Sequence, residues 1–192
     1  NGDDNVILLN PKQSDNGYYV ETGWATTSKN IDLPNSKSLW SIEGSTKLTP
    51  NSPVILSWTN SQNIKFVKEI SLDKQYLFNI KQTIINSSDK TYNFYPYGQI
   101  IRNVAPDVTN FYILHEGLIG VFDDQLVEED YDDIEEKKYS KNAQSGWLGI
   151  TDKYWLTSLI PEKDKNFRSD FDYKNKFRAN FIETNATEVG AN

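Results

Sequence analysis

The stretch Ile64-Lys65-Phe66-Val67-Lys68-Glu69-Ile70-Ser71-Leu72 carries the clearest structural signal in the chain. Apolar side chains stand at positions 64, 66, 70 and 72, and most residues between them are polar. This period of two is typical of a β-strand with one face in a core and the other in water. The run Tyr76 to Asn86 repeats the pattern. We therefore predict two antiparallel strands joined by a hairpin connection at Leu72 to Tyr76.

Similar alternating runs, separated by Ser, Asn, Asp and Gly, occur along much of the chain. They favour an all-β fold of the sandwich class, with a helix of one or two turns only around Tyr131 to Tyr139. No repeat and no Gly/Ser linker divides the sequence, so we expect a single domain over residues 1–192. The further predicted strands are Val6 to Asn10, Tyr18 to Thr27, Leu39 to Thr49, Pro53 to Thr59, Thr91 to Arg102 and Phe111 to Phe122.

Composition excludes several classes of function. The chain has 192 residues, is 37% apolar and contains neither Cys nor Met, which excludes disulfides and thiolate chemistry. No apolar run is long enough to cross a bilayer, the first residues do not resemble an export signal, and we expect the sequence to be a segment of a longer protein. The net charge is −7, so electrostatic repulsion disfavours nucleic acid and anionic lipid as partners.

One segment accounts for the charge imbalance. Residues Asp123 to Glu136 contain nine carboxylates and no base. The spacing and the central Gly of an EF-hand are absent, so the sequence predicts a solvated, mobile acidic segment and no metal site.

Catalytic signals are weak. The single histidine, His115, is followed by Glu116, but neighbouring residues on a strand point to opposite faces, so a structural role is favoured over a general base. Phosphate-binding, dinucleotide-binding and nucleophile-elbow motifs are absent. We therefore expect no catalytic, cofactor-binding or metal-binding residues.

Aromatic residues are the strongest positive feature of the composition. The chain has 5 Trp, 11 Tyr and 9 Phe. The tryptophans are predicted to serve one core. A cluster of aromatics on one strand is expected to pack in the core or across the sheet, with a ligand groove as the alternative. The tryptophans are Trp24, Trp40, Trp58, Trp147 and Trp155, and the cluster contains Tyr92, Phe94, Tyr95 and Tyr97.

The segment Gly146 to Pro161, GWLGITDKYWLTSLIP, carries a family resemblance. It resembles the G-W-x₆-Y-[FW]-x₃-[WL]-I-P pattern in the large periplasmic domain of bacterial members of the YidC/Oxa1/Alb3 family of membrane protein insertases. Tyr97-Gly98-Gln99-Ile100 is similar to that family's [FY]-G-Q-[IL] segment. The resemblance covers about residues 6–161 and is weak beyond them. It implies structural roles for Gly98, Gly146, Trp147, Tyr154, Trp155 and Pro161.

The resemblance also carries expectations about fold and function. It implies a twisted antiparallel β-supersandwich resembling galactose mutarotase, truncated at both ends, in the periplasm beside the inner membrane. It implies a non-enzymatic domain that assists insertion and folding of membrane proteins through contacts with the Sec translocon subunits SecD/SecF or with nascent membrane proteins. The groove used for insertion lies outside this chain, so no direct membrane insertion is expected of it. The alternative is a carbohydrate-binding or aldose-epimerase-like protein on the same fold.

Overall fold

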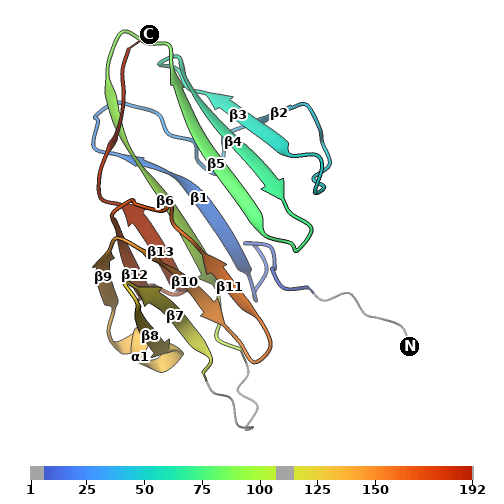
Figure 1. Ribbon diagram of the computed structural model, residues 1–192, viewed down its shortest axis with the longest axis vertical. Helices are drawn as coiled ribbons and strands as arrows, with labels where there is room; N and C mark the ends of the chain where they lie inside the picture. The colour runs from blue at the N-terminus through green and yellow to red at the C-terminus, as the bar shows by residue number, and fades with distance from the viewer. Residues whose placement is uncertain (1–6, 107–114, 192) are drawn as a thin grey trace. The chain divides into compact units, whose positions relative to one another are not determined.

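The computed structural model describes residues 7–106 and 115–191, and these form a nearly all-β structure (Figure 1). The predicted all-β class is confirmed. Strands β1 to β7 span Tyr18–Thr26, Ser41–Glu43, Val54–Thr59, Ile64–Leu72, Phe78–Asn86, Tyr92–Arg102 and Gly117–Phe122. Strands β8 to β14 span Gln125–Asp130, Tyr139–Ala143, Gly146–Thr151, Leu156–Leu159, Phe167–Tyr173, Phe177–Glu183 and Thr187–Val189. The helix α1, Tyr131–Glu136, lies where a short helix was predicted.

The β4–β5 hairpin follows the prediction closely. The two strands pair antiparallel from Ile64 opposite Asn86 to Leu72 opposite Phe78. Asp73 shapes the connection, because its carboxylate accepts the backbone N–H of Gln75 at 2.7 Å and that of Leu77 at 2.9 Å. Such side-chain bonds to the backbone are the reason that Asp favours turns.

Two other predicted strands are largely wrong. In the run Val6 to Asn10, Val6 lies outside the described residues, and only Asn10 forms an isolated bridge, with Tyr18. The run Leu39 to Thr49 contributes only β2, because Gly44 adopts φ +81° and Ser45 then bonds locally to the backbone of Lys47. Local side-chain bonds of this kind compete with the strand ladder. Of Phe111 to Phe122, residues 111–114 lie outside the described part, and β7 begins at Gly117.

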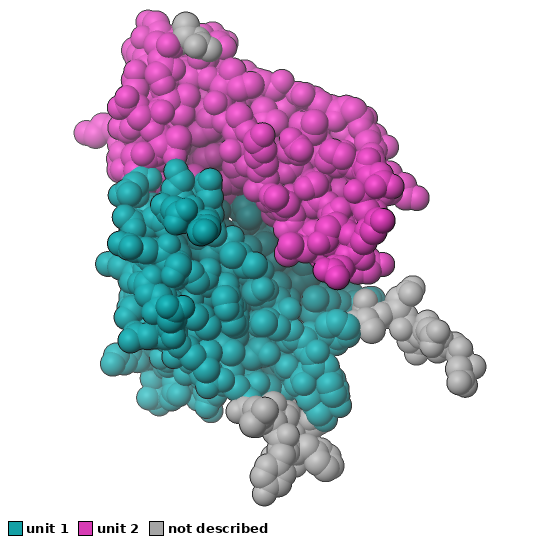
Figure 2. Space-filling view, in the orientation of Figure 1, with its two compact units in different colours: residues 1–22, 97–185 teal, residues 23–96, 186–192 magenta. Residues whose placement is uncertain are grey.

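The chain divides into two compact units, coloured separately in Figure 2. Unit 1 comprises residues 1–22 and 97–185, and unit 2 comprises residues 23–96 and 186–192. Strands β1 and β6 each contribute residues to both units. The expectation of a single domain over residues 1–192 stays a prediction.

Unit 1 is a sandwich of two sheets. One sheet has the order β1-β6-β13-β12-β9 and the other the order β11-β10-β7-β8. Their inner faces share a core to which the first sheet contributes Ile100 and Phe171 and the second Phe122 and Leu148. Helix α1 adds Tyr131 and Ile134 to the same core.

Unit 2 is built on the sheet β2-β3-β4-β5. Its core contains Trp24 from β1, Ile64 and Phe66 from β4, and Tyr92 and Phe94 from β6. The Phe66 ring lies 5.1 Å from that of Trp24 and 5.7 Å from that of Phe94, between ring centroids. Such tilted and edge-on aromatic contacts are favourable beyond the area that they bury.

The expectation of a mobile segment at Asp123 to Glu136 is wrong. Residues Gln125–Asp130 form β8, which pairs with β7, and the following residues form α1. The carboxylates remain at the surface, but Tyr131 and Ile134 are 8% and 2% exposed. These two apolar side chains, three positions apart on one helix face, dock the segment on the core.

Candidate functional site

A surface cavity of about 350 Å³ is the candidate site of unit 1. Four of its residues come from separate places along the chain: Tyr18 begins β1, Arg102 ends β6, Asp152 follows β10, and Trp155 precedes β11. Apolar residues and two asparagines complete the lining. These residues are Ile7, Leu8, Asn10, Asn16, Val104, Ala105 and Pro106.

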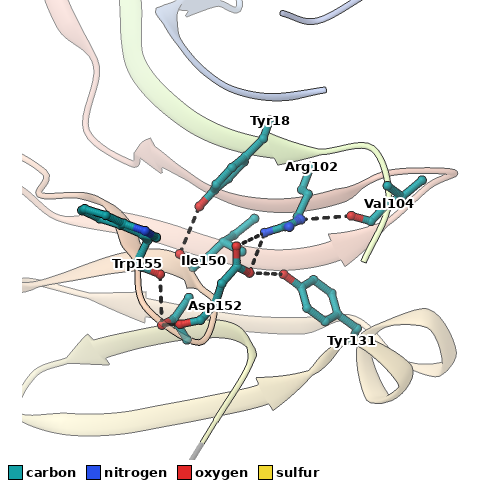
Figure 3. Close-up of polar contacts among 8 residues, drawn as sticks. Tyr18, Arg102, Val104, Tyr131, Ile150, Asp152 and Trp155 are labelled. Carbon is teal, nitrogen blue, oxygen red and sulfur yellow. Dashed lines mark hydrogen bonds and ion pairs between the residues drawn. The ribbon is translucent and has the colours of Figure 1, made fainter. Parts of the chain in front are cut away.

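An ion pair between Arg102 and Asp152 organises the polar side of the cavity (Figure 3). Nη1 of Arg102 donates to both carboxylate oxygens of Asp152 at 2.5 Å, and Nε donates to the carbonyl of Val104 at 3.0 Å. The guanidinium carbon also lies 4.9 Å from the centre of the Tyr18 ring, a cation–π distance. The Tyr131 hydroxyl reaches Asp152 Oδ1 at 3.5 Å. The arginine is therefore held by contacts on several sides.

Local backbone structure presents Asp152 to this arginine. The backbone N–H of Asp152 donates to the carbonyl of Trp155 at 2.8 Å, which closes the turn between β10 and β11. Trp155, at the other end of the same turn, also lines the cavity. One tight turn thus carries both the charged partner of Arg102 and the largest aromatic side chain of the lining.

Burial sets the protonation of the two tyrosines in this cluster. It raises the pKa of Tyr18 to about 12, and the Tyr18 hydroxyl donates to the carbonyl of Ile150 at 3.1 Å. Burial likewise raises the pKa of Tyr131. For Arg102, burial alone would lower the pKa, but the hydrogen bond to Asp152 gives a net increase. At neutral pH both phenols stay protonated and the arginine stays charged, which suits recognition better than proton transfer.

The two glycines and the proline of the family pattern lie at crowded or buried positions of unit 1. A Cβ on Gly98 of β6 would lie 2.6 Å from the ring of Phe181, its partner on β13, so any larger residue there would force this ring to move. Gly146 has φ +130°, and a Cβ there would collide with the carbonyl of Val121. Pro161 is buried. The structural roles that the resemblance implies for these residues stay a prediction.

The aromatic residues of the same pattern lie at the surface. Trp155 is 49% exposed and Tyr154 is 76% exposed, while Trp147 is half-buried and lies in neither core cluster. The expectation that all five tryptophans serve one core is therefore wrong. Trp24 is buried in unit 2, with Trp40 and Trp58 packed against that core.

The aromatic cluster on β6 is divided between the two faces of the strand. Tyr92 is buried beside Phe94, with 6.4 Å between their ring centroids, so it cannot line an open groove. Tyr95 and Tyr97 occupy alternate positions on the opposite face of the strand and are half-buried. A ligand role for these two residues stays a prediction.

His115 contacts residues other than Glu116. Its Nδ1 lies 3.2 Å from Asp130 Oδ1, and its Nε2 lies 3.3 Å from the carbonyl oxygen of Leu118. Both ring nitrogens thus face partners at the start of β7 and the end of β8, as expected of a histidine with a structural role.

Sequence reasoning missed the Arg102 cluster. The only signal was that Arg102 is one of three arginines beside 17 lysines and ends an apolar strand. Its partner Asp152 is 50 positions away, and their proximity follows from the packing of two sheets, which strand periodicity does not report.

The chain belongs to the YidC periplasmic domain family. The sequence model of that family matches residues 1–192. It is 55% identical over 192 residues to the membrane protein insertase YidC of Pelagibacter ubique, covering 100% of this chain and 34% of that protein. It is 42% identical over 184 residues to the YidC of Rickettsia akari, covering 92% and 33%. The YidC of Rickettsia prowazekii is 45% identical over 170 residues, covering 88% and 30%.

These matches confirm the family resemblance and the assignment to a periplasmic domain. The chain spans about a third of the length of these relatives. Within the part of the chain that the structure describes, no helix is long and apolar enough to cross a membrane.

Proposed function

We propose that this chain is a non-enzymatic interaction domain of a membrane protein insertase. In this function the domain contacts SecD/SecF or nascent membrane proteins in the periplasm and thereby assists insertion and folding. The observation that carries the proposal is the position of Trp155, which lines the cavity while about half of its surface reaches solvent. An exposed aromatic beside a partly buried arginine is the composition that protein-binding hot spots favour.

The residues around Trp155 fit a polypeptide ligand. Its neighbour Tyr154 is exposed, and Lys153 lies 5.1 Å from the Tyr154 ring centre. Ile7 and Val104 add exposed apolar surface at the same cavity. Aromatic and aliphatic surface around a fixed polar cluster offers burial for apolar side chains together with orientation by hydrogen bonds.

Binding to SecD/SecF tests the proposal. The purified chain is titrated onto immobilised SecDF complex, and Trp155→Ala should weaken binding by about tenfold or more. Tyr76→Ala is the matched control, because Tyr76 is 80% exposed and belongs to unit 2. Equal effects of the two substitutions, or no effect of either, would exclude the cavity as the contact.

The sugar-epimerase alternative has a direct assay. An epimerase needs an acid and a base that converge on a sugar ring, whereas His115 faces Asp130 and a backbone carbonyl. The assay follows the optical rotation of epimerisable aldoses with the wild-type chain and with His115→Ala. Turnover by the wild type that is lost in the variant would favour the enzyme over the interaction domain.

A further inference from the structure

The outer face of the sheet β11-β10-β7-β8 carries an apolar patch outside the core of unit 1. Along β7, Leu118 and Phe122 point into the core, so Ile119 and Val121 point to the other face. The register places Val121 between Trp147 of β10 and Leu126 of β8. Three apolar side chains thus lie side by side across three strands.

The patch extends toward β11. Gly149 pairs with Ile119 on one side and with Ser158 on the other, and the Leu156 side chain lies close over it. Leu126 and Leu156 are 58% and 45% exposed, and the residues between them are half-buried. We name this surface the outer patch, and it consists of Ile119, Val121, Leu126, Trp147 and Leu156.

Carboxylates border the outer patch along β8. The outward positions that follow Leu126 are Glu128, directly opposite Ile119, and Asp130, whose side chain is 68% exposed. Both belong to the acidic stretch of nine carboxylates without a base. The patch therefore combines apolar surface with a negative edge.

We propose that the outer patch docks a polypeptide segment in which apolar residues are followed by Lys or Arg. The apolar residues would cover the row of Trp147, Val121 and Leu126, and the basic residues would meet the carboxylates of β8. Charge argues against two other occupants. An anionic lipid surface would be repelled, and a second copy would bring its own acidic edge and a further charge of −7.

This proposal goes beyond the cavity and does not depend on it, because the two surfaces share no residue. Trp155→Ala should therefore leave docking on the outer patch unchanged.

The experiment measures binding of two soluble probe peptides to the purified chain by fluorescence anisotropy. Each contains alternating Leu and Ser, followed by a run of Lys in one peptide and of Glu in the other. At low salt we expect the Lys peptide to bind at least about tenfold more tightly than the Glu peptide. The difference between the two affinities should shrink as added salt screens the charges. Labelled anionic vesicles serve as a third probe. Equal binding of the two peptides, or binding of the vesicles and of neither peptide, would overturn the proposal.

Two substitutions locate the binding on the outer patch. Leu126→Ser should weaken binding of the Lys peptide by about fivefold or more, while Leu39→Ser, at a side chain 90% exposed in unit 2, should not. Glu128→Lys should reduce the preference for the Lys peptide, while the same charge change at exposed Asp89 in unit 2 should have a much smaller effect. All four substitutions change exposed side chains, and circular dichroism verifies that each variant is folded. Matching effects of test and control variants would contradict the assignment.

Discussion

Arg102 and Asp152 connect the two sheets of unit 1 through a single nitrogen that donates to both carboxylate oxygens at 2.5 Å. Arg102 ends β6 in one sheet, and Asp152 follows β10 in the other. Their side chains are only 15% and 24% exposed. Because little solvent screens this pair, loss of one partner leaves the other charge poorly solvated.

Removing one partner should therefore destabilise the fold. We expect Asp152→Asn to lower the free energy of unfolding by about 2 to 4 kcal/mol, somewhat less than for a fully buried pair. Urea denaturation followed by circular dichroism measures the change. The control is Lys12→Ala, which breaks the exposed pair with Glu21 and should cost at most about 1 kcal/mol. A similar loss of unfolding free energy in both variants would show that the Arg102–Asp152 pair stabilises the fold no more than an exposed ion pair does.

The tryptophans should differ in their effect on stability. Trp24 is 5% exposed and contacts Phe66 in the core of unit 2, so Trp24→Ala should cost about 3 to 5 kcal/mol. Trp155 is 49% exposed, so Trp155→Ala should cost less than about 1 kcal/mol. The urea midpoints of the two variants give the comparison. A large shift for Trp155→Ala would mean that this residue stabilises the fold and would weaken its proposed binding role.

Strand positions were predictable where alternation and turn residues agreed. β4 begins and ends where the sequence placed it, because the apolar period is clear and Asp73 marks the turn. The run Leu39 to Thr49 failed because Gly44 and Ser45 form local structure that ends β2 early. Apolar period alone does not report such competition from side-chain bonds.

The acidic stretch shows a different limit of sequence reasoning. Its net charge predicts a solvated segment, but eight of its nine carboxylates are exposed and Glu129 is half-buried. Tyr131 and Ile134 meanwhile enter the core. The stretch is ordered because its apolar residues share one face of the helix, and its total charge does not report this arrangement. The Arg102 cluster could not be predicted at all, because its members meet only when the two sheets pack.

Two glycines provide a matched test of steric need. Gly44 has φ +81° with no atom within 4 Å of a Cβ, so Gly44→Ala should cost only the backbone term of about 1 to 2 kcal/mol. Gly146 has φ +130°, and its Cβ would also collide with the carbonyl of Val121 on the paired strand. Gly146→Ala should therefore cost about 3 to 5 kcal/mol. Thermal or urea unfolding of both variants measures the difference, and equal costs would show that β7 and β10 can separate without penalty.

The raised pKa of Tyr18 predicts a loss of stability at alkaline pH. Burial moves this pKa from its ordinary value of 10 to about 12 in the folded chain. Between these values the unfolded chain releases the phenol proton and the folded chain keeps it, so the stabilisation is complete below pH 10 and is lost as pH rises toward 12. By pH 11 this loss should amount to roughly 1 kcal/mol.

Tyr18→Phe isolates that contribution, because it removes the phenol and keeps the ring. At pH 8 the wild type should be more stable by about 1 kcal/mol, owing to the hydrogen bond from Tyr18 to Ile150. That advantage should shrink steadily above pH 10 and be close to zero by about pH 11, since only the wild type has this phenol to ionise. Urea denaturation of both proteins at intervals from about pH 8 to 11 gives the two curves. Curves that stay parallel over this range would mean that Tyr18 ionises as readily in the folded chain as in the unfolded one.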